Sequence, residues 1–151
     1  MNRLDQIDLK IIRLLQMDAV MTNASIAEAV GLSAAAVFER VKRLKKNNII
    51  VNMRAIIDPN LVGQSFLSFV FLKTRGVGKR AQIEELSKIL EIEEIYSTAG
   101  QFSLFLKIRC SKPRDMEAIY ERIYEIPGIE SSETMTSFDT LLERPMHIPS
   151  N

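Results

Sequence analysis

The sequence predicts an α+β protein: an N-terminal three-helix domain containing a helix-turn-helix, followed by a C-terminal ferredoxin-like plait. Two observations support this division. Over the first 50 residues, apolar side chains recur every three or four positions, which is the spacing of amphipathic helices. After residue 63, strand-like and helical runs follow in the order β-α-β-β-α-β, which forms an antiparallel sheet with helices on one face.

Composition limits the classes of protein to consider. Of the 151 residues, 46% are hydrophobic and 26% are charged, which suffices for one ordinary domain or two small ones. Residues 1–50 hold 8 Lys and Arg against 5 Asp and Glu, a net charge of +3, whereas residues 51–151 carry −2. This asymmetry indicates that the basic N-terminal part and the mildly acidic remainder have different functions. The sequence has neither a membrane-spanning run nor a signal-peptide core, so we expect no membrane partner and a cytoplasmic protein.

The first helix is expected over residues 5–17. Asp5 and Asp8 fall in its first turn, where the helix dipole favours negative charge. This helix should pack across the second and third helices, expected over residues 24–30 and from 34 to about 47. Together the three helices would complete a domain over residues 1–50.

The second and third helices have the spacing of a helix-turn-helix. Ala27 is small enough for the third helix to cross close over it, and Gly31 can take the positive φ of the turn. Ser33 is expected to cap the third helix. On a helical wheel, its buried face comprises Ala34, Val37, Val41 and Leu44.

The outer face of the third helix is small near its N-terminus and basic toward its C-terminus. Small residues let a helix enter a groove, and basic residues reach phosphates. We expect Arg43 and Glu39 to contact base edges, and Arg40 to contact a phosphate or form a structural ion pair. The expected DNA-binding residues are Ser33, Ala35, Ala36, Glu39, Arg40, Lys42, Arg43 and Lys46.

A linker over residues 51–63 should follow. Residues 49–57 are rich in β-forming side chains and predict a strand, which Asp58-Pro59-Asn60 ends. Because this strand is apolar on both faces, a partner subunit is its natural cover. The plait is expected over 64–143, and a loose tail over 144–151.

In the plait, strands are expected over residues 65–73, 92–99 and 102–110, and a final strand or strand pair over about 129–142. One helix should end near Leu90, which is expected to face inward, and another should cover 113–125. The first strand is apolar on both faces. The helices cover one face, and packing on another subunit's sheet would cover the other; the N-terminal domain or the tail are alternative covers. The expected interface residues are Leu67, Phe69, Phe71 and Phe105.

Catalytic and metal-binding patterns are not found in the sequence. His147 is the only histidine and lies in the expected tail. Cys110 is the only cysteine and ends an apolar strand, which favours a packing role. We therefore expect no catalytic residue, no metal and no cofactor.

Six short motifs lie between residues 4 and 129, within a region of resemblance from about residue 4 to 143. They are Leu4-Asp5-x-x-Asp8-x-x-Ile11, Val30-Gly31-Leu32-Ser33, Glu39-Arg40-Val41-x-x-Leu44, Asp58-Pro59, Gly100-x-Phe102 and Ile126-Pro127-Gly128-Ile129. Together they resemble the Lrp/AsnC family of transcription regulators, also called feast/famine regulators. The resemblance implies a homodimer that binds palindromic double-stranded DNA and often assembles into octamers or related rings. It also implies that an amino acid can bind between dimers.

The resemblance places the effector site at the turn after the second strand and at the last strand. The corresponding residues are Ala99, Gly100, Gln101, Phe102, Ser103, Thr134, Met135 and Thr136. The family's turn usually reads Gly, acid, aromatic, Asp, whereas Gln101 and Ser103 are neutral. A bound ammonium group needs a counter-charge or several acceptors. Two hypotheses follow: a different ligand held by neutral hydrogen bonds, or a regulator without an effector.

These observations predict a sequence-specific, DNA-binding transcription regulator. The third helices of a dimer should enter successive major grooves, with half-sites about one helical turn apart. An architectural DNA-compacting protein and an effector-independent regulator are the alternatives. A sensing or assembly module that no longer binds DNA is a further alternative, against which the basic face argues.

Overall fold

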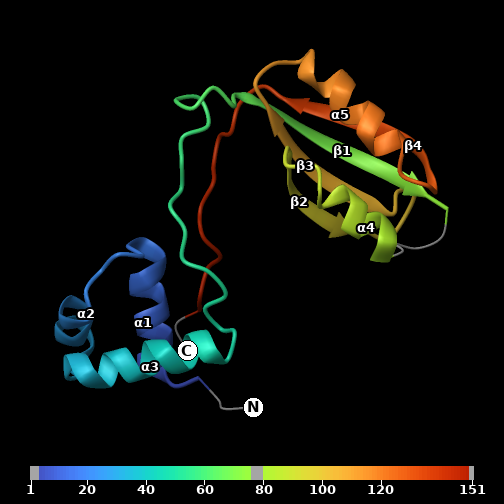
Figure 1. The fold of residues 1–151 in the computed structure, drawn as a ribbon. Helices are drawn as coiled ribbons and strands as arrows, with labels where there is room; N and C mark the ends of the chain where they lie inside the picture. Colours follow the sequence, from blue (N-terminus) through green and yellow to red (C-terminus); the bar gives the residue numbers. More distant parts are fainter. Residues whose placement is uncertain (1–3, 76–79, 150–151) are drawn as a thin grey trace. The chain divides into compact units, whose positions relative to one another are not determined.

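The computed structural model describes residues 4–75 and 80–149, which form two compact units (Figure 1). The helical unit comprises residues 4–56 with 142–149, and the sheet unit comprises residues 57–141. The helical unit contains α1 (Gln6–Met17), α2 (Asn23–Val30) and α3 (Ala34–Lys46). The three predicted N-terminal helices are confirmed.

Side-chain caps begin all three of these helices. At α1, the Asp5 carboxylate accepts from the Asp8 amide while the Asp8 carboxylate accepts from the Asp5 amide. This reciprocal capping box satisfies two donors that a helix otherwise leaves unpaired. Thr22 caps α2 and Ser33 caps α3. The three helices meet in a core formed by Ile11, Ile26, Ala27, Val37 and Leu44.

The segment after α3 differs from the prediction. Residues 51–57 form no strand, and Val51 and Ile56 are exposed. The β-rich composition is present, but a strand also needs a second strand to accept and donate its backbone hydrogen bonds. The described chain offers no such partner to these residues. The predicted strand over 49–57 is therefore absent from the single chain.

The C-terminal segment, residues 142–149, belongs to the helical unit. It forms neither helix nor strand, as a loose tail would, but side chains of α1 donate hydrogen bonds to it. The Arg13 side chain donates to the Pro149 carbonyl at 3.2 Å, and the Gln16 side chain donates to the Met146 carbonyl at 3.2 Å.

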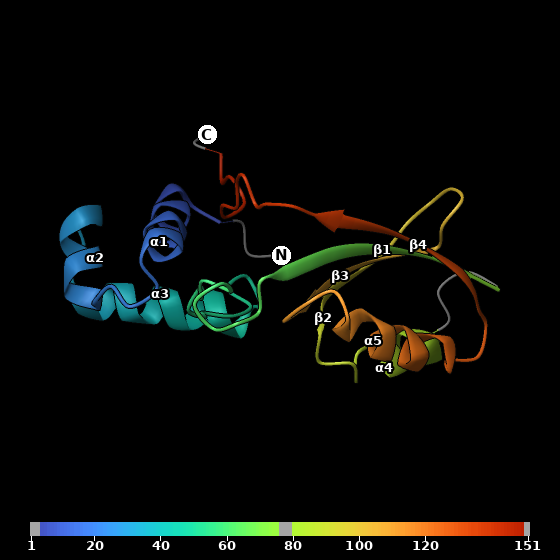
Figure 2. The ribbon, with the colours of Figure 1, turned by 90° about the horizontal axis from the view of Figure 1, so that it is seen from above.

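The sheet unit is the predicted ferredoxin-like plait. Its elements are β1 (Phe66–Thr74), α4 (Arg80–Leu86), β2 (Ile92–Ser97), β3 (Leu104–Cys110), α5 (Asp115–Tyr124) and β4 (Ile129–Ser137). The strands form one antiparallel sheet in the order β2-β3-β1-β4. Figure 2 shows α4 and α5 on the same side of this sheet.

Alternation along the strands divides the sheet into two faces. Val70 and Leu72 of β1 and Leu104, Leu106 and Ile108 of β3 are fully buried and pack in one core beneath the helices. That core also contains Met116, Ile119 and Ile123 of α5. Residues of opposite parity, including Phe69, Phe71 and Phe105, lie on the face without helices.

The end of α4 also differs from the prediction. The helix ends at Leu86, and a tighter turn follows in which the Ile89 amide donates to the Leu86 carbonyl at 3.1 Å. Ile89 is therefore buried, whereas Leu90, expected to face inward, is 90% exposed. A tighter turn rotates successive side chains by about 120° instead of about 100°, which moves the apolar position by one residue.

Candidate DNA-binding surface and effector region

The turn between α2 and α3 is held by local hydrogen bonds. Gly31 has φ +71°, and the Leu32 amide donates to the Ala27 carbonyl at 3.0 Å. Only glycine takes this left-handed conformation without steric cost. The Ser33 hydroxyl then accepts from the Ala36 amide at 3.2 Å and starts α3. Ala27 is 5% exposed, in agreement with its expected place under the crossing helices.

Most of the predicted DNA-binding residues lie together on the exposed side of α3. Ser33, Ala35, Glu39, Lys42, Arg43 and Lys46 are exposed, whereas Ala36 and Arg40 are half-buried. Ala34, expected in the core, is exposed because it is the first residue of α3 and no preceding helical turn covers it. The buried line of α3 runs through Val37 and Leu44. Two exposed residues that the prediction left out are Phe38 and Lys45.

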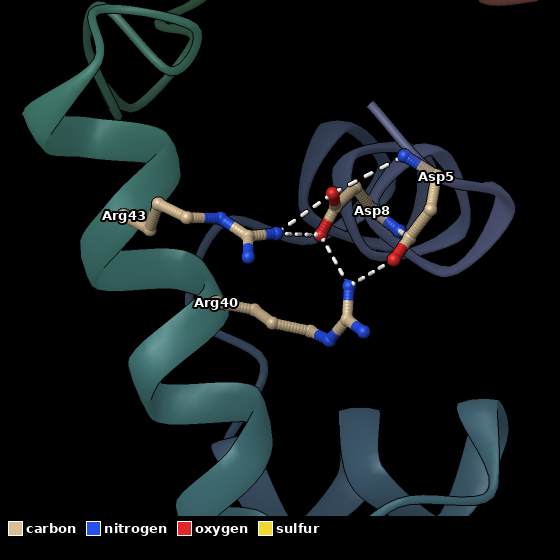
Figure 3. A network of polar contacts seen from close by, with 4 residues as sticks. All are labelled: Asp5, Asp8, Arg40 and Arg43. Carbon is tan, nitrogen blue, oxygen red and sulfur yellow. Dashed lines mark hydrogen bonds and ion pairs between the residues drawn. The ribbon is translucent and has the colours of Figure 1, made fainter. Parts of the chain in front are cut away.

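Figure 3 shows two arginines of α3 reaching the first turn of α1. Arg40 Nη1 lies 2.7 Å from Asp5 Oδ2 and 2.8 Å from Asp8 Oδ1. Arg43 Nη2 lies 2.8 Å from both carboxylate oxygens of Asp8. The Asp8 side chain is 3% exposed, so it is a buried carboxylate that two guanidinium groups and a backbone amide satisfy. Buried charges are tolerated only when they are paired in this way.

The network shifts the pKa values of two of its members. The pKa of Asp5 is held below its ordinary value, first by the hydrogen bond from the Asp8 amide and then by the one from Arg40. The hydrogen bonds to Asp5 and Asp8 raise the pKa of Arg40. Asp5 and Arg40 therefore remain charged at neutral pH. Of the two roles expected for Arg40, the structure shows the ion pair.

This network joins residues about 35 positions apart, which sequence reasoning did not anticipate. The spacing of Asp5 and Asp8 carried a usable signal, because acids three positions apart at a helix start can form a capping box. The network holds α3 against α1 through Arg40 and Arg43, which lie on the side of α3 opposite Phe38. It thereby determines which side chains of α3 point outward.

The predicted effector turn connects β2 and β3. Gly100 has φ +123°, and the Thr98 hydroxyl donates to the Phe102 carbonyl at 2.8 Å. The Ser103 amide donates to the Leu72 carbonyl at 2.9 Å, and its hydroxyl accepts from the Thr74 amide at 3.4 Å. Ala99, Gly100 and Gln101 are exposed, and Phe102 and Ser103 are half-buried. Ser103 thus fastens the turn to the end of β1.

The other half of the predicted effector site lies on β4, at a sheet edge. Thr134, Met135 and Thr136 pair with Val70, Phe69 and Ser68. Thr134 and Thr136 therefore share the helix face with Val70, and the Thr134 hydroxyl is hydrogen-bonded to the Tyr120 hydroxyl of α5. Met135 lies on the opposite face. In one chain, β1 lies between β4 and the turn, so the two halves of the predicted site are not adjacent.

The helix-free face of the sheet carries a cluster of aromatic rings. The Phe69 and Phe105 rings are stacked with centroids 5.5 Å apart, and Phe71 lies 5.0 Å from Phe105. Phe102 and Tyr96 extend the cluster toward the effector turn. Leu67 is only 6% exposed, so it contributes little accessible surface. The other three residues of the predicted interface are half-buried and accessible.

The described residues include one thiol, but neither a metal-binding cluster nor a helix able to span a membrane. Burial raises the pKa of the Cys110 thiol, which makes it a poor nucleophile and is compatible with packing. Within residues 4–75 and 80–149, no three or more His, Cys, Asp or Glu side chains are placed to hold a metal ion. Over the same ranges, no helix is both long and apolar enough to cross a membrane.

Comparison with known proteins agrees with this architecture. Residues 4–45 match the AsnC-type helix-turn-helix domain, and residues 68–146 match the Lrp/AsnC ligand binding domain. The chain is 35% identical over 138 residues to the HTH-type transcriptional regulator FL11 of Pyrococcus horikoshii, covering 91% of each. It is 31% identical to a proline dehydrogenase transcriptional activator of Rhizobium radiobacter, and the match covers 93% of this chain and 92% of that protein.

A solved structure gives the same result. The feast or famine regulatory protein of M. tuberculosis, in complex with L-methionine, superposes with a TM-score of 0.90 at 30% identity, covering 97% of this chain and 100% of that one. The fold, the helix-turn-helix and the second domain together define a DNA-binding transcriptional regulator with a ligand-binding domain. The chain belongs to the Lrp/AsnC family. The predicted family, fold class and general function are thereby confirmed.

Proposed function

We propose that this chain works as a homo-oligomer whose dimer binds a palindromic double-stranded DNA site through two copies of α3. The observation that carries the proposal is the outer side of α3, which is exposed, small at Ala35 and basic at Lys42 and Lys46. Such a face can enter the major groove and neutralise phosphates on either side. We assign the protein no catalytic role and propose that it is cytoplasmic.

The residues of α3 would have distinct roles in this complex. Ser33 and Ala35 would allow close approach, Lys42 and Lys46 would contact phosphates, and Glu39 would accept from cytosine N4. Arg43 uses Nη2 for Asp8, which leaves Nη1 and Nε as donors for a guanine.

Arg40 has a side chain only 23% exposed and makes two ion pairs. We therefore assign Arg40 to orienting α3 against α1, and Ala36, on the same flank, to helix packing. Neither residue is needed for direct contact with DNA in this proposal.

A salt titration tests the DNA-binding face. A site selected from a random duplex library and a scrambled duplex are titrated with the wild-type chain, Lys42→Ala and Lys88→Ala. The side chains of Lys42 and Lys88 are 66% and 68% exposed, so Lys88, in the sheet unit, is a matched control. Lys42→Ala should reduce the salt slope by about one, or about two for two copies, whereas Lys88→Ala should not. An unchanged slope would remove Lys42 from the contact surface.

The same titration separates a regulator from an architectural DNA-compacting protein. A regulator should bind the selected duplex about 10³-fold more tightly than the scrambled one, or better. Equal affinities for the two duplexes would favour compaction. Such a result would leave the DNA-binding face in place but remove the sequence specificity.

Oligomerisation is supported by the aromatic cluster on the helix-free face. Phe69, Phe71 and Phe105 together form an accessible apolar surface, which Lys107 and Glu133 border on the neighbouring strands. The exposed apolar residues of the segment 51–57 need a similar cover. A second copy of the chain would cover both, and dimers could then assemble into octamers.

Effector binding is supported by the ligand-binding domain match and by the methionine complex of the mycobacterial relative. In this chain, Gln101 and Ser103 would supply neutral hydrogen bonds at the turn, and Thr134 and Thr136 would do so at β4. Because the two halves lie apart in one chain, the site would form between subunits. Met135, on the helix-free face, would line the same junction.

A thermal-shift screen with the twenty amino acids tests the effector proposal. A ligand at about a hundred times its dissociation constant stabilises by roughly 2.7 kcal/mol, which should raise the melting temperature by a few degrees. The site variant Gln101→Ala should lose the shift in melting temperature. A flat screen on an intact oligomer would favour the effector-independent alternative.

A further inference from the structure

Phe38 is a large aromatic residue of α3 that the core of the helical unit does not use. It is 51% exposed, whereas the adjacent Val37 is fully buried. The side chains of Ala34 and Ala35 beside it are small, and the Lys42 Nζ lies 5.9 Å from the centre of its ring. A single exposed apolar side chain is common on protein surfaces and needs no special explanation by itself. The position of Phe38 on α3 is what distinguishes it.

Phe38 is the fifth residue of α3 and lies in the half of the helix that approaches bases in helix-turn-helix proteins. At about 100° per residue, it lies about 60° around the axis from Ala35 and about 40° from Lys42. Arg43 lies on the opposite flank of the outer face. Phe38 is therefore a large apolar group set beside the small and basic residues that we assign to the groove.

The surroundings of Phe38 favour a nucleic-acid partner over a protein partner. Glu39, Lys42, Lys45 and Lys46 lie on the same exposed side of α3. The centres of protein–protein interfaces are depleted in charged residues. A partner that accepts several cations next to one apolar ring needs anionic groups flanking a small apolar group. In the major groove, phosphates flank the C5 methyl of thymine, which is the apolar feature of the base edges there.

We propose that Phe38 is a specificity-determining residue that contacts the C5 methyl of a thymine in each half-site. Lys42 shields the outer edge of the ring and contacts a flanking phosphate. The operator then carries a T·A pair opposite the first two turns of α3. This inference rests on the proposed entry of α3 into the major groove, and it adds the base that the helix prefers there.

Replacing thymine with deoxyuridine tests the inference directly, because it removes the C5 methyl and keeps every hydrogen-bonding group. The operator is selected with the full-length wild-type chain, and each thymine is replaced in turn in both half-sites. We expect one position at which the replacement lowers wild-type affinity about three- to fivefold per half-site. Phe38→Ala should bind the thymine duplex more weakly and should bind both duplexes equally well.

Two further variants complete the test. Phe38→Gln keeps a helix-forming side chain and should also lose the preference, so the result does not depend on Phe38→Ala folding. Val20→Ala removes an exposed apolar side chain from the turn between α1 and α2 and should keep the full preference. Circular dichroism and light scattering on each variant verify its helix content and oligomeric state.

The outcomes separate this inference from the proposed function. If the wild type tolerates deoxyuridine at every thymine, or if both Phe38 variants keep the preference, the inference is wrong. The proposed function then stands as long as Lys42→Ala still lowers the salt slope. A Phe38 variant that changes oligomeric state but keeps the base preference would assign the ring to a protein contact and overturn the inference. If no operator is selected, the proposed function fails, and the inference fails with it.

Discussion

The helical unit and the sheet unit differ in how their surfaces are completed. In the helical unit, the buried carboxylate of Asp8 finds both arginine partners within the same chain, and the three helices enclose their own core. In the sheet unit, the helices cover one face, and the rings of Phe69, Phe71 and Phe105 remain accessible on the other. The geometry of the proposed DNA-binding surface is therefore set within one chain, whereas we propose that a second chain covers the helix-free face of the sheet unit.

The largest expected effect comes from placing a charge on the helix-free face. Phe69→Asp should weaken self-association by about a hundredfold or more, because it replaces a stacked ring with a carboxylate that must lose its hydration between the sheets. Light scattering coupled to gel filtration measures it. The control is Leu90→Asp, which puts the same charge at an exposed position of the same unit and should leave association unchanged. A stable Phe69→Asp dimer would mean that the sheet unit is not completed through this face.

The next effect concerns the buried charge of the helical unit. Asp8→Ala should destabilise that unit by about 1–3 kcal/mol, since it removes a cap and leaves Arg40 and Arg43 without their shared partner. Denaturant unfolding combined with amide hydrogen exchange over residues 4–46 localises the loss. Glu28→Ala, an exposed acid of α2, is the control and should have little effect. A loss spread equally over both units would contradict the independence of the helical unit.

Arg43 tests whether the network and the DNA surface share a residue. Arg43→Ala should lower affinity for a selected site by about 1–3 kcal/mol if Nη1 and Nε read a guanine, and should relax specificity at that base. Fluorescence anisotropy on cognate and single-base variant duplexes measures both changes. Equal losses on cognate and scrambled duplexes would show that Arg43 acts on phosphates or only through Asp8.

The smallest effect is the pH dependence of the capping box. The folded-state pKa of Asp5 lies below its ordinary value of 3.8, so its stabilising contribution is present above that value. This contribution is lost as the pH falls below about 3.8 and through the lower folded-state pKa. Asp5→Asn keeps a capping oxygen but does not titrate. The difference in melting temperature between the wild type and Asp5→Asn should be constant from pH 7 to 5 and shrink below pH 4.

The predictable parts of the fold were those that local patterns specify. The cap at Ser33 and the left-handed Gly31 depend on neighbouring backbone atoms, so their spacing located the turn between α2 and α3. Alternation along 65–73 likewise separated Val70 and Leu72 from Phe69 and Phe71. Most of the exposed face of α3 was predictable because helical spacing within one helix determines it.

Tertiary contacts decided the rest. The pairing of Asp8 with Arg40 and Arg43 joins α1 to α3, and no local rule reports which arginine a distant carboxylate will reach. The apolar segment over 49–57 has strand character, yet it is not a strand in one chain because no strand among the described residues pairs with it.

Short elements and side-chain exposure show the same division. The end of α4 depends on a tight turn that packing against the sheet allows, which buries Ile89 and exposes Leu90. Helical spacing and turn chemistry act over a few residues and can be read from the sequence. Charged groups, strand edges and exposed rings find their partners in distant parts of the sequence, and only the folded chain identifies those partners.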